Sequence, residues 1–181
     1  MKNISYIPMI LCLCMILNPT LSSAGSTLSK TIHITGNVYI PPCVINNGQP
    51  IDFNFSDMST LKIDGKNYAK SLSFPVACSY FQGVPYIKVV ANHLAGAPLN
   101  VLATGIDGFG ISLNFGDSVD SANPLNISNA ADSGYPITAG FTNPNTNASQ
   151  LTITAVPYKL SNIILDARPF SVATTITVIY Q

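Results

Sequence analysis

The stretch that decides the fold runs from Leu28 to Cys43 and reads LSKTIHITGNVYIPPC. Apolar side chains recur at every second position, and only a lysine and a glycine interrupt them. The apolar face consists of Leu28, Ile32, Ile34, Val38 and Ile40, interrupted by Lys30 and Gly36, and the polar face of Thr31, His33, Thr35 and Asn37. This alternation predicts an extended strand with one buried side. An apolar strand left free near a chain end is an aggregation hazard, so it needs a partner. That partner is either its own sheet, the ordinary interpretation, or another molecule.

Residues 1–24 have the pattern of a secretory signal peptide. A lysine at position 2 precedes an apolar run over residues 7–17, and small residues occupy positions 22–24, where a signal peptidase would cut. The run is too short for a membrane span, and no later segment approaches its length. We therefore expect an exported protein without membrane insertion.

The cysteines predict a single disulfide. Two of the four cysteines fall within the signal, which leaves Cys43 and Cys78. In an exported chain such a pair predicts one disulfide. It would close a loop of 35 residues, which stabilises the fold by roughly 4 kcal/mol in the chain-entropy model. No histidine or cysteine neighbours complete a metal site, so we expect no metal.

Composition favours an all-β protein of nearly zero charge. Beyond the signal, seven basic residues face eight aspartates and no glutamate, which leaves no electrostatic footprint for nucleic acid. Thirteen prolines and twelve glycines separate short apolar runs, as in a sandwich or barrel of short strands. An Asn-Gly turn is expected at residues 46–48. Strands are predicted at 51–55, 71–78, 86–90, 99–103, 109–115, 135–141, 151–157 and 172–180.

Nothing in the sequence points to catalysis. The exported chain has two histidines, His33 and His93, and neither accompanies a nucleophile motif or a phosphate-binding loop. Asp117 and Asp120 lie close together in a loop but lack the ligand spacing of a calcium site. We therefore expect a protein that is not an enzyme and needs no cofactor.

Residues 36–48, GNVYIPPCVINNG, resemble the start of a chaperone–usher pilin, in particular the minor tip adaptor of P-type pili. The same resemblance covers nearly the whole exported chain. It extends to NVLAT at 100–104, FGISL at 109–113, ITAG at 137–140, AVPY at 155–158 and TVIYQ at 177–181. It implies an incomplete immunoglobulin-like β-sandwich, lacking its last strand, over residues 41–181. Residues 25–40 would be an N-terminal extension that donates a strand to another subunit.

The resemblance also implies a mechanism of strand exchange, a form of β-augmentation. The donor positions would be Lys30, Ile32, Ile34, Gly36 and Val38. The acceptor groove, which also binds the chaperone, would be lined by Val172, Thr174, Ile176, Val178 and Tyr180. Implied partners are a periplasmic pilus chaperone, an outer-membrane usher and neighbouring subunits that include a tip adhesin. The protein would pass through the periplasm and end in a fimbrium on the bacterial surface.

Two positions depart from the pattern of the family, and one alternative function stays open. Arg168 stands where pilins have a glycine, and Lys30 occupies a donor position that is usually apolar. The alternative is a glycan-binding minor pilin, because a loop such as Tyr80-Phe81-Gln82 offers aromatic and polar groups to a sugar.

Overall fold

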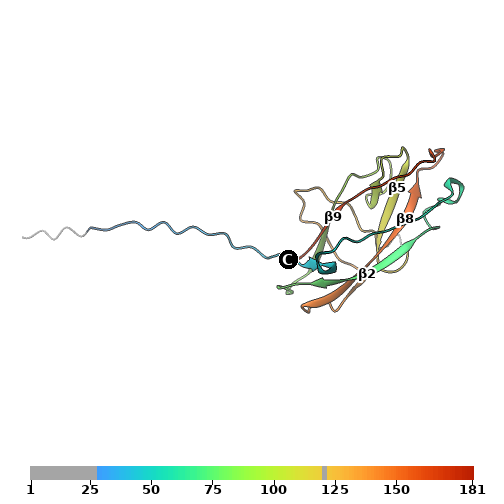
Figure 1. Ribbon diagram of the computed structural model, residues 1–181. Helices are drawn as coiled ribbons and strands as arrows, with labels where there is room; N and C mark the ends of the chain where they lie inside the picture. The colour runs from blue at the N-terminus through green and yellow to red at the C-terminus, as the bar shows by residue number, and fades with distance from the viewer. Residues whose placement is uncertain (1–27, 120–121) are drawn as a thin grey trace, which may run out of the picture. The chain divides into compact units, whose positions relative to one another are not determined.

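The computed structural model describes residues 28–119 and 122–181 (Figure 1). The predicted signal at 1–24 lies outside the described residues. The chain divides into two units, one ending at Asn37 and one beginning at Val38. Every strand that the structure describes belongs to the second unit, and we call residues 43–181 of that unit, from Cys43 onward, the body.

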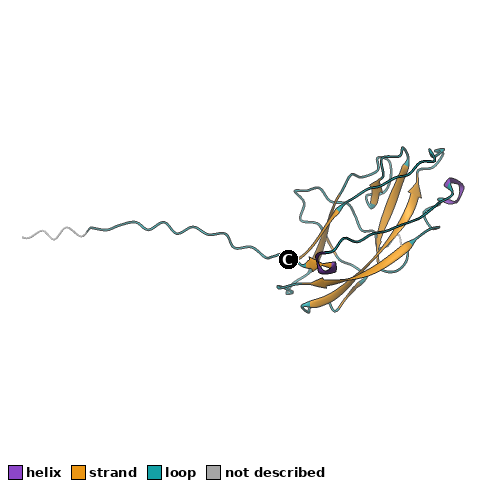
Figure 2. Cartoon of the chain, in the orientation of Figure 1, coloured by secondary structure: helices purple, strands orange, loops and turns teal. Residues whose placement is uncertain are grey.

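The body is built from two antiparallel sheets (Figure 2). The larger sheet has six strands in the order β1-β2-β8-β5-β4, with β7 also paired to β8. Its strands are β1 (Val44–Ile45), β2 (Lys70–Ala77), β4 (Val101–Ala103), β5 (Phe109–Phe115), β7 (Phe141–Thr142) and β8 (Ala148–Lys159). The smaller sheet has the order β6-β3-β9, with β3 (Pro85–Val90), β6 (Tyr135–Pro136) and β9 (Thr175–Tyr180). Two short 3-10 turns, η1 (Asn46–Gly48) and η2 (Thr60–Lys62), complete the elements.

Both sheets contribute side chains to one hydrophobic core. The alternation predicted from the sequence gives β2 its inward face, where Phe74 and Val76 are buried between exposed neighbours. From the smaller sheet, β3 contributes Ile87 and Val89, and β9 contributes Val178 and Tyr180. The body is therefore a β-sandwich, as the composition predicts, because each sheet buries one face against the other.

The predicted disulfide between Cys43 and Cys78 is present, and it joins residues 35 positions apart. Cys43 precedes β1 and Cys78 follows β2, so the bond ties together the ends of two paired strands. Cys78 is buried in the core, as its place on the apolar face of the strand predicts.

Replacement of Cys78 by serine is expected to lower the free energy of unfolding by about 4 kcal/mol, because the unfolded chain regains the freedom of the closed loop. The measurement is chemical unfolding followed by circular dichroism. Wild-type protein under reducing conditions is the matched control and should lose a similar amount. An unchanged unfolding midpoint in both samples would contradict a stabilising role for the bond.

The prediction of one strand over residues 135–141 is wrong, because this segment leaves one sheet and joins the other. β6 pairs with β3, whereas β7 pairs with β8. Gly140 lies between them with φ +69, and a Cβ there would come within 2.5 Å of the backbone nitrogen of Gly116. A close backbone approach of this kind needs glycine.

The turn expected at residues 46–48 is present, but the strand expected at 51–55 is not. Asn46, Asn47 and Gly48 all have positive φ and form η1, and the Asn46 side chain donates to the carbonyls of Gln49 and Pro50. The chain therefore turns away from β1 instead of pairing back onto it. Residues 51–55 keep the alternation, with Phe55 buried and Asp52 and Asn54 exposed, but they belong to no strand.

Other strands differ from the predictions mainly in their ends. β8 is longer than the strand predicted at 151–157, because it pairs with β2 on one side and with β5 and β7 on the other. β9 begins at Thr175, so residues 172–174 lie outside the ladder. Pro75, which has no N–H to donate, lies where β2 pairs with β8 alone.

Candidate functional site

A long groove runs along one side of the body. It has a volume of about 1200 Å³. One wall is formed by residues 48–56 and the other by residues 170–176. Its floor is apolar and consists of Leu102, Ile111, Leu113, Ile153 and Ala155, from strands β4, β5 and β8. These floor residues belong to the core of the larger sheet and are only 1–6% exposed, so the groove runs directly over the core between two wall segments.

Most backbone polar groups of the two walls are unpaired, and the exceptions over residues 50–56 are the Pro50 carbonyl and the Ser56 N–H, which bond to the side chains of Asn46 and Asn54. No backbone–backbone hydrogen bond joins residues 50–56, or residues 165–174, to another described residue. β9 pairs with β3 along one edge over its whole length, and its opposite edge lines the groove at Thr175 and Ile176. Backbone N–H and C=O groups are almost always paired in buried regions of a protein, so such walls are suited to pair with an added strand.

The groove is closed at one end by the start of the body. The backbone N–H of Cys43 donates to the carbonyl of Val178 across 2.8 Å. The disulfide holds Cys43 in this place by joining it to Cys78 at the end of β2. At the other end, near Phe170, the walls are not bridged by any hydrogen bond between described residues. We call these two places the closed end and the open end.

The predicted acceptor residues divide between the groove and the core. Val172, Thr174 and Ile176 line the groove, whereas Val178 and Tyr180 lie outside its lining and are fully buried. The Thr174 hydroxyl donates to the carbonyl of Val90, which positions the wall just before β9 begins. Burial raises the pKa of the Tyr180 hydroxyl, because a tyrosinate would lose its hydration there.

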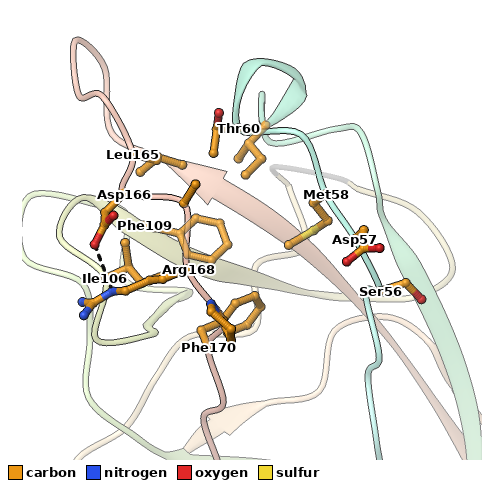
Figure 3. A pocket seen from close by; sticks show the side chains of 13 residues that line it. Ser56, Asp57, Met58, Thr60, Ile106, Phe109, Leu165, Asp166, Arg168 and Phe170 are labelled. Atoms are coloured by element: carbon orange, nitrogen blue, oxygen red, sulfur yellow. Dashed lines mark ion pairs between the residues drawn. The ribbon is translucent and has the colours of Figure 1, made fainter.

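A second cavity continues the groove beyond its open end. This end pocket has a volume of about 440 Å³ and shares Ser56 and Phe170 with the groove (Figure 3). Phe170 packs edge-on against Phe109 with ring centroids 5.1 Å apart. Arg168, one of the two positions at which the sequence departs from the expected pattern, forms an ion pair with Asp166 and donates to the carbonyl of Gly105. This arginine therefore anchors the wall segment to the loop that precedes β5.

The predicted donor positions lie in a segment without secondary structure. Residues 28–42 belong to no strand, and the apolar side chains of residues 28–40 are exposed, to 90% for Ile34 and 100% for Val38. The expectation of one buried face is therefore wrong for the single chain. Gly36 has no neighbouring atom within 4 Å of the place where a Cβ would stand. The apolar face of Lys30, Ile32, Ile34, Gly36 and Val38 is thus present but unpaired.

The remaining candidate residues do not gather into a site. Tyr80, Phe81 and Gln82 line neither the groove nor the end pocket. The Nε2–H group of His93 donates to the carbonyls of Ala97 and Pro98, so His93 serves its own loop. Over residues 28–119 and 122–181, no group of three or more possible metal ligands occurs. In the same described ranges, no helix is long and apolar enough to cross a membrane.

One carboxylate has a shifted pKa, and its cause is a local turn. The Asp64 side chain accepts hydrogen bonds from the N–H groups of Asn67 and Lys66. These bonds favour the ionised form and hold the pKa of Asp64 below its usual value. The shift thus reflects turn geometry, not a reactive site.

Sequence reasoning missed the wall at 48–56 and the floor of the groove. The alternation of Ile51, Phe53 and Phe55 was visible, but it predicted a paired strand and not an unpaired wall. The floor residues come from three strands that meet only after folding. Nothing in a single sequence marks them as different from other core residues.

Comparisons with known proteins agree with this architecture. Residues 32–181 match the family model described as fimbrial protein. The chain is 36% identical over 161 residues to the fimbrial adapter PapF of Escherichia coli, covering 89% of this chain and 93% of that protein. It is 35% identical over the same length, with the same coverage, to the minor fimbrial protein PrsF of Escherichia coli.

Solved structures show the same fold. The structure of the P pilus adaptor subunit PapF matches with a TM-score of 0.55 and 32% identity, over 80% of this chain and all of that one. The P pilus rod subunit PapA, at 19% identity, matches with a TM-score of 0.50 over 83% of this chain and all of that one, which bears on the fold alone. The sandwich is accordingly the immunoglobulin-like fold of pilin subunits, and the chain belongs to the fimbrial protein family.

Proposed function

We propose that this protein is a minor structural subunit of a chaperone–usher fimbrium, which joins a tip adhesin to the pilus as an adaptor. The observation that carries the proposal is the groove, because two unpaired walls stand over an apolar floor. Sequence relatives described as an adapter and a minor fimbrial protein support the adaptor role.

Strand insertion follows from the chemistry of the groove. An extended strand has two hydrogen-bonding edges, so one inserted strand would satisfy both walls at once. Every second side chain of that strand would lie on the floor formed by residues such as Ile111 and Ile153. The sandwich would gain its last strand, and the apolar lining of the groove would be covered.

The N-terminal extension supplies the strand that would be inserted into a neighbour's groove. Residues 28–38 carry an alternating apolar face that is exposed in the single chain. Inserted into the groove of a neighbour, this face would be removed from water, which is the main driving force for association. Each subunit thus donates one strand and accepts another. Such heterologous contacts generate an open fibre instead of a closed ring.

The same groove would serve during export. A periplasmic chaperone would fill it with a strand of its own, and the outer-membrane usher would be the place where a neighbouring extension replaces that strand. The unpaired walls support this step, because a subunit with an open groove presents edges that aggregate when left free. The protein would therefore pass through the periplasm in a complex and end on the cell surface.

A synthetic peptide of residues 25–40 tests the donor half of the proposal. The preceding subunit is the neighbour whose groove would receive this extension. When the peptide is added to the complex of that subunit with its chaperone, it should displace the chaperone, and a new complex should appear on a native gel. Gly36→Asn should slow displacement by about tenfold or more, because a side chain obstructs the close approach of backbones. Thr35→Asn, which introduces the same residue on the opposite face of the strand, is the matched control. A wild-type peptide that displaces no chaperone would refute the donor role.

A further inference from the structure

Two large apolar side chains stand almost fully in water beside the end pocket. Leu61 is 92% exposed and Ile164 is 98% exposed. Each adjoins a residue that lines the pocket, Thr60 in the first case and Leu165 in the second. Figure 3 shows Thr60 and Leu165 at the same margin of the pocket. We call Leu61 and Ile164 the open-end rim.

The rim has no structural task within its own chain. The neighbouring apolar residues Ile63 and Leu165 turn inward, and Ile63 is buried. Leu61 belongs to η2, and Ile164 to the loop between β8 and β9. A single exposed leucine is ordinary, but two bulky apolar side chains at the end of an unfilled groove mark a contact surface.

The direction of an inserted strand determines what would reach the rim. All pairings in the smaller sheet are antiparallel, and β9 runs from the open end toward Val178 at the closed end. A strand added beside β9 in the same pattern would run toward the open end. The residues that follow the donor strand would therefore emerge at the rim.

The length of the connection places the neighbour close by. In this chain, Cys43 lies five positions after Val38, the last donor position, and is fixed by its disulfide and by its bond to Val178. A chain segment of five positions spans at most about 17 Å when fully extended. A donor subunit of the same layout must therefore begin its body within that distance of the open end.

This chain's own connection shows the chemistry that a donor of the same layout would bring to an apolar rim. It reads Tyr39-Ile40-Pro41-Pro42, and its four side chains are exposed in the single chain. The two prolines lack an N–H group, so this segment is poorly suited to extend a ladder and is left to make side-chain contacts. An apolar connection that leaves the groove beside Leu61 and Ile164 would bury both partners.

We propose that the open-end rim binds the apolar connection between the donor strand and the body of the adjoining subunit. This contact rests on the proposed function, since it requires that the groove be filled by a neighbour. It adds a second contact outside the groove, which fixes the angle between successive bodies in the fibre.

The test is site-specific photocrosslinking in assembled fimbriae. A benzoylphenylalanine is placed at Leu61, at Ile164, at Leu99 as an exposed apolar control outside the groove, and at Asp52 on the groove wall. The rim positions should give adducts with the residues of a neighbour between its donor strand and its first cysteine. Leu99 should give no such adduct, and Asp52 should crosslink to the donor strand itself.

The outcomes separate this contact from the proposed function. If Asp52 crosslinks to a donor strand but the rim crosslinks only to a chaperone, to the usher or to nothing, the rim contact is refuted and strand exchange stands. If Asp52 gives no adduct with a neighbour, strand exchange itself is refuted. The double variant L61S/I164S provides a second measurement, because its fimbriae should dissociate about tenfold faster in denaturant than those of L99S. Equal dissociation rates would also overturn the contact.

Discussion

Removal of residues 28–38 is expected to abolish joining to the preceding subunit while leaving the body folded. The removed side chains are exposed, to 100% for Val38, so the deletion removes little buried apolar area from the single chain. Cys43 and its disulfide stay in place, so the closed end of the groove is unchanged. The shortened subunit should therefore still bind a chaperone strand through its own groove.

Co-purification and assembly assays measure the two halves of this result. The shortened chain should co-purify with its chaperone in wild-type amounts and should form no detectable complex with the preceding subunit. A full-length chain that carries Thr31→Ala and Thr35→Ala is the matched control, because it alters only the polar face of the extension. A shortened chain that aggregates despite the chaperone would mean that the extension serves its own fold.

Ile176→Asp is expected to weaken strand insertion by at least about 100-fold. Ile176 is half-buried and lines the groove, so a carboxylate there stays hydrated while the groove is open. An inserted strand would cover it and bury a charge without a partner, which costs several kcal/mol. The variant should therefore fold but fail to hold a chaperone or a neighbouring extension.

The matched control for this variant lies on the same strand. Thr177 pairs with Lys88 and is absent from the lining of the groove, so Thr177→Asp adds the same charge beside a lysine and away from an inserted strand. It should co-purify with the chaperone as wild type does, whereas Ile176→Asp should not. Equal recovery of the two variants would exclude Ile176 from the binding surface. Val178→Asp is less informative, because Val178 is fully buried and its replacement would disturb the core itself.

The sequence by itself determined the all-β class and the approximate positions of the longer strands β2, β3, β5 and β8. Alternation with period two is a local signal, so the inward face of β2, with Phe74 and Val76, was predictable without any knowledge of its partners. The disulfide was predictable for a different reason, because the expected loss of the signal leaves only Cys43 and Cys78 to pair. The alternating face of residues 28–40 likewise indicated a strand that needs a partner.

Only the tertiary structure decided which of these alternating segments find a partner within the chain. Ile51, Phe53 and Phe55 alternate as well as the residues of β2 do, yet they form a wall without a ladder. Val172 and Val178 share the predicted face of one strand, but one lines the groove and the other is buried beneath the bond from Cys43. Pairing depends on hydrogen bonds between segments far apart in the chain, and period-two alternation records only which side of a segment is apolar.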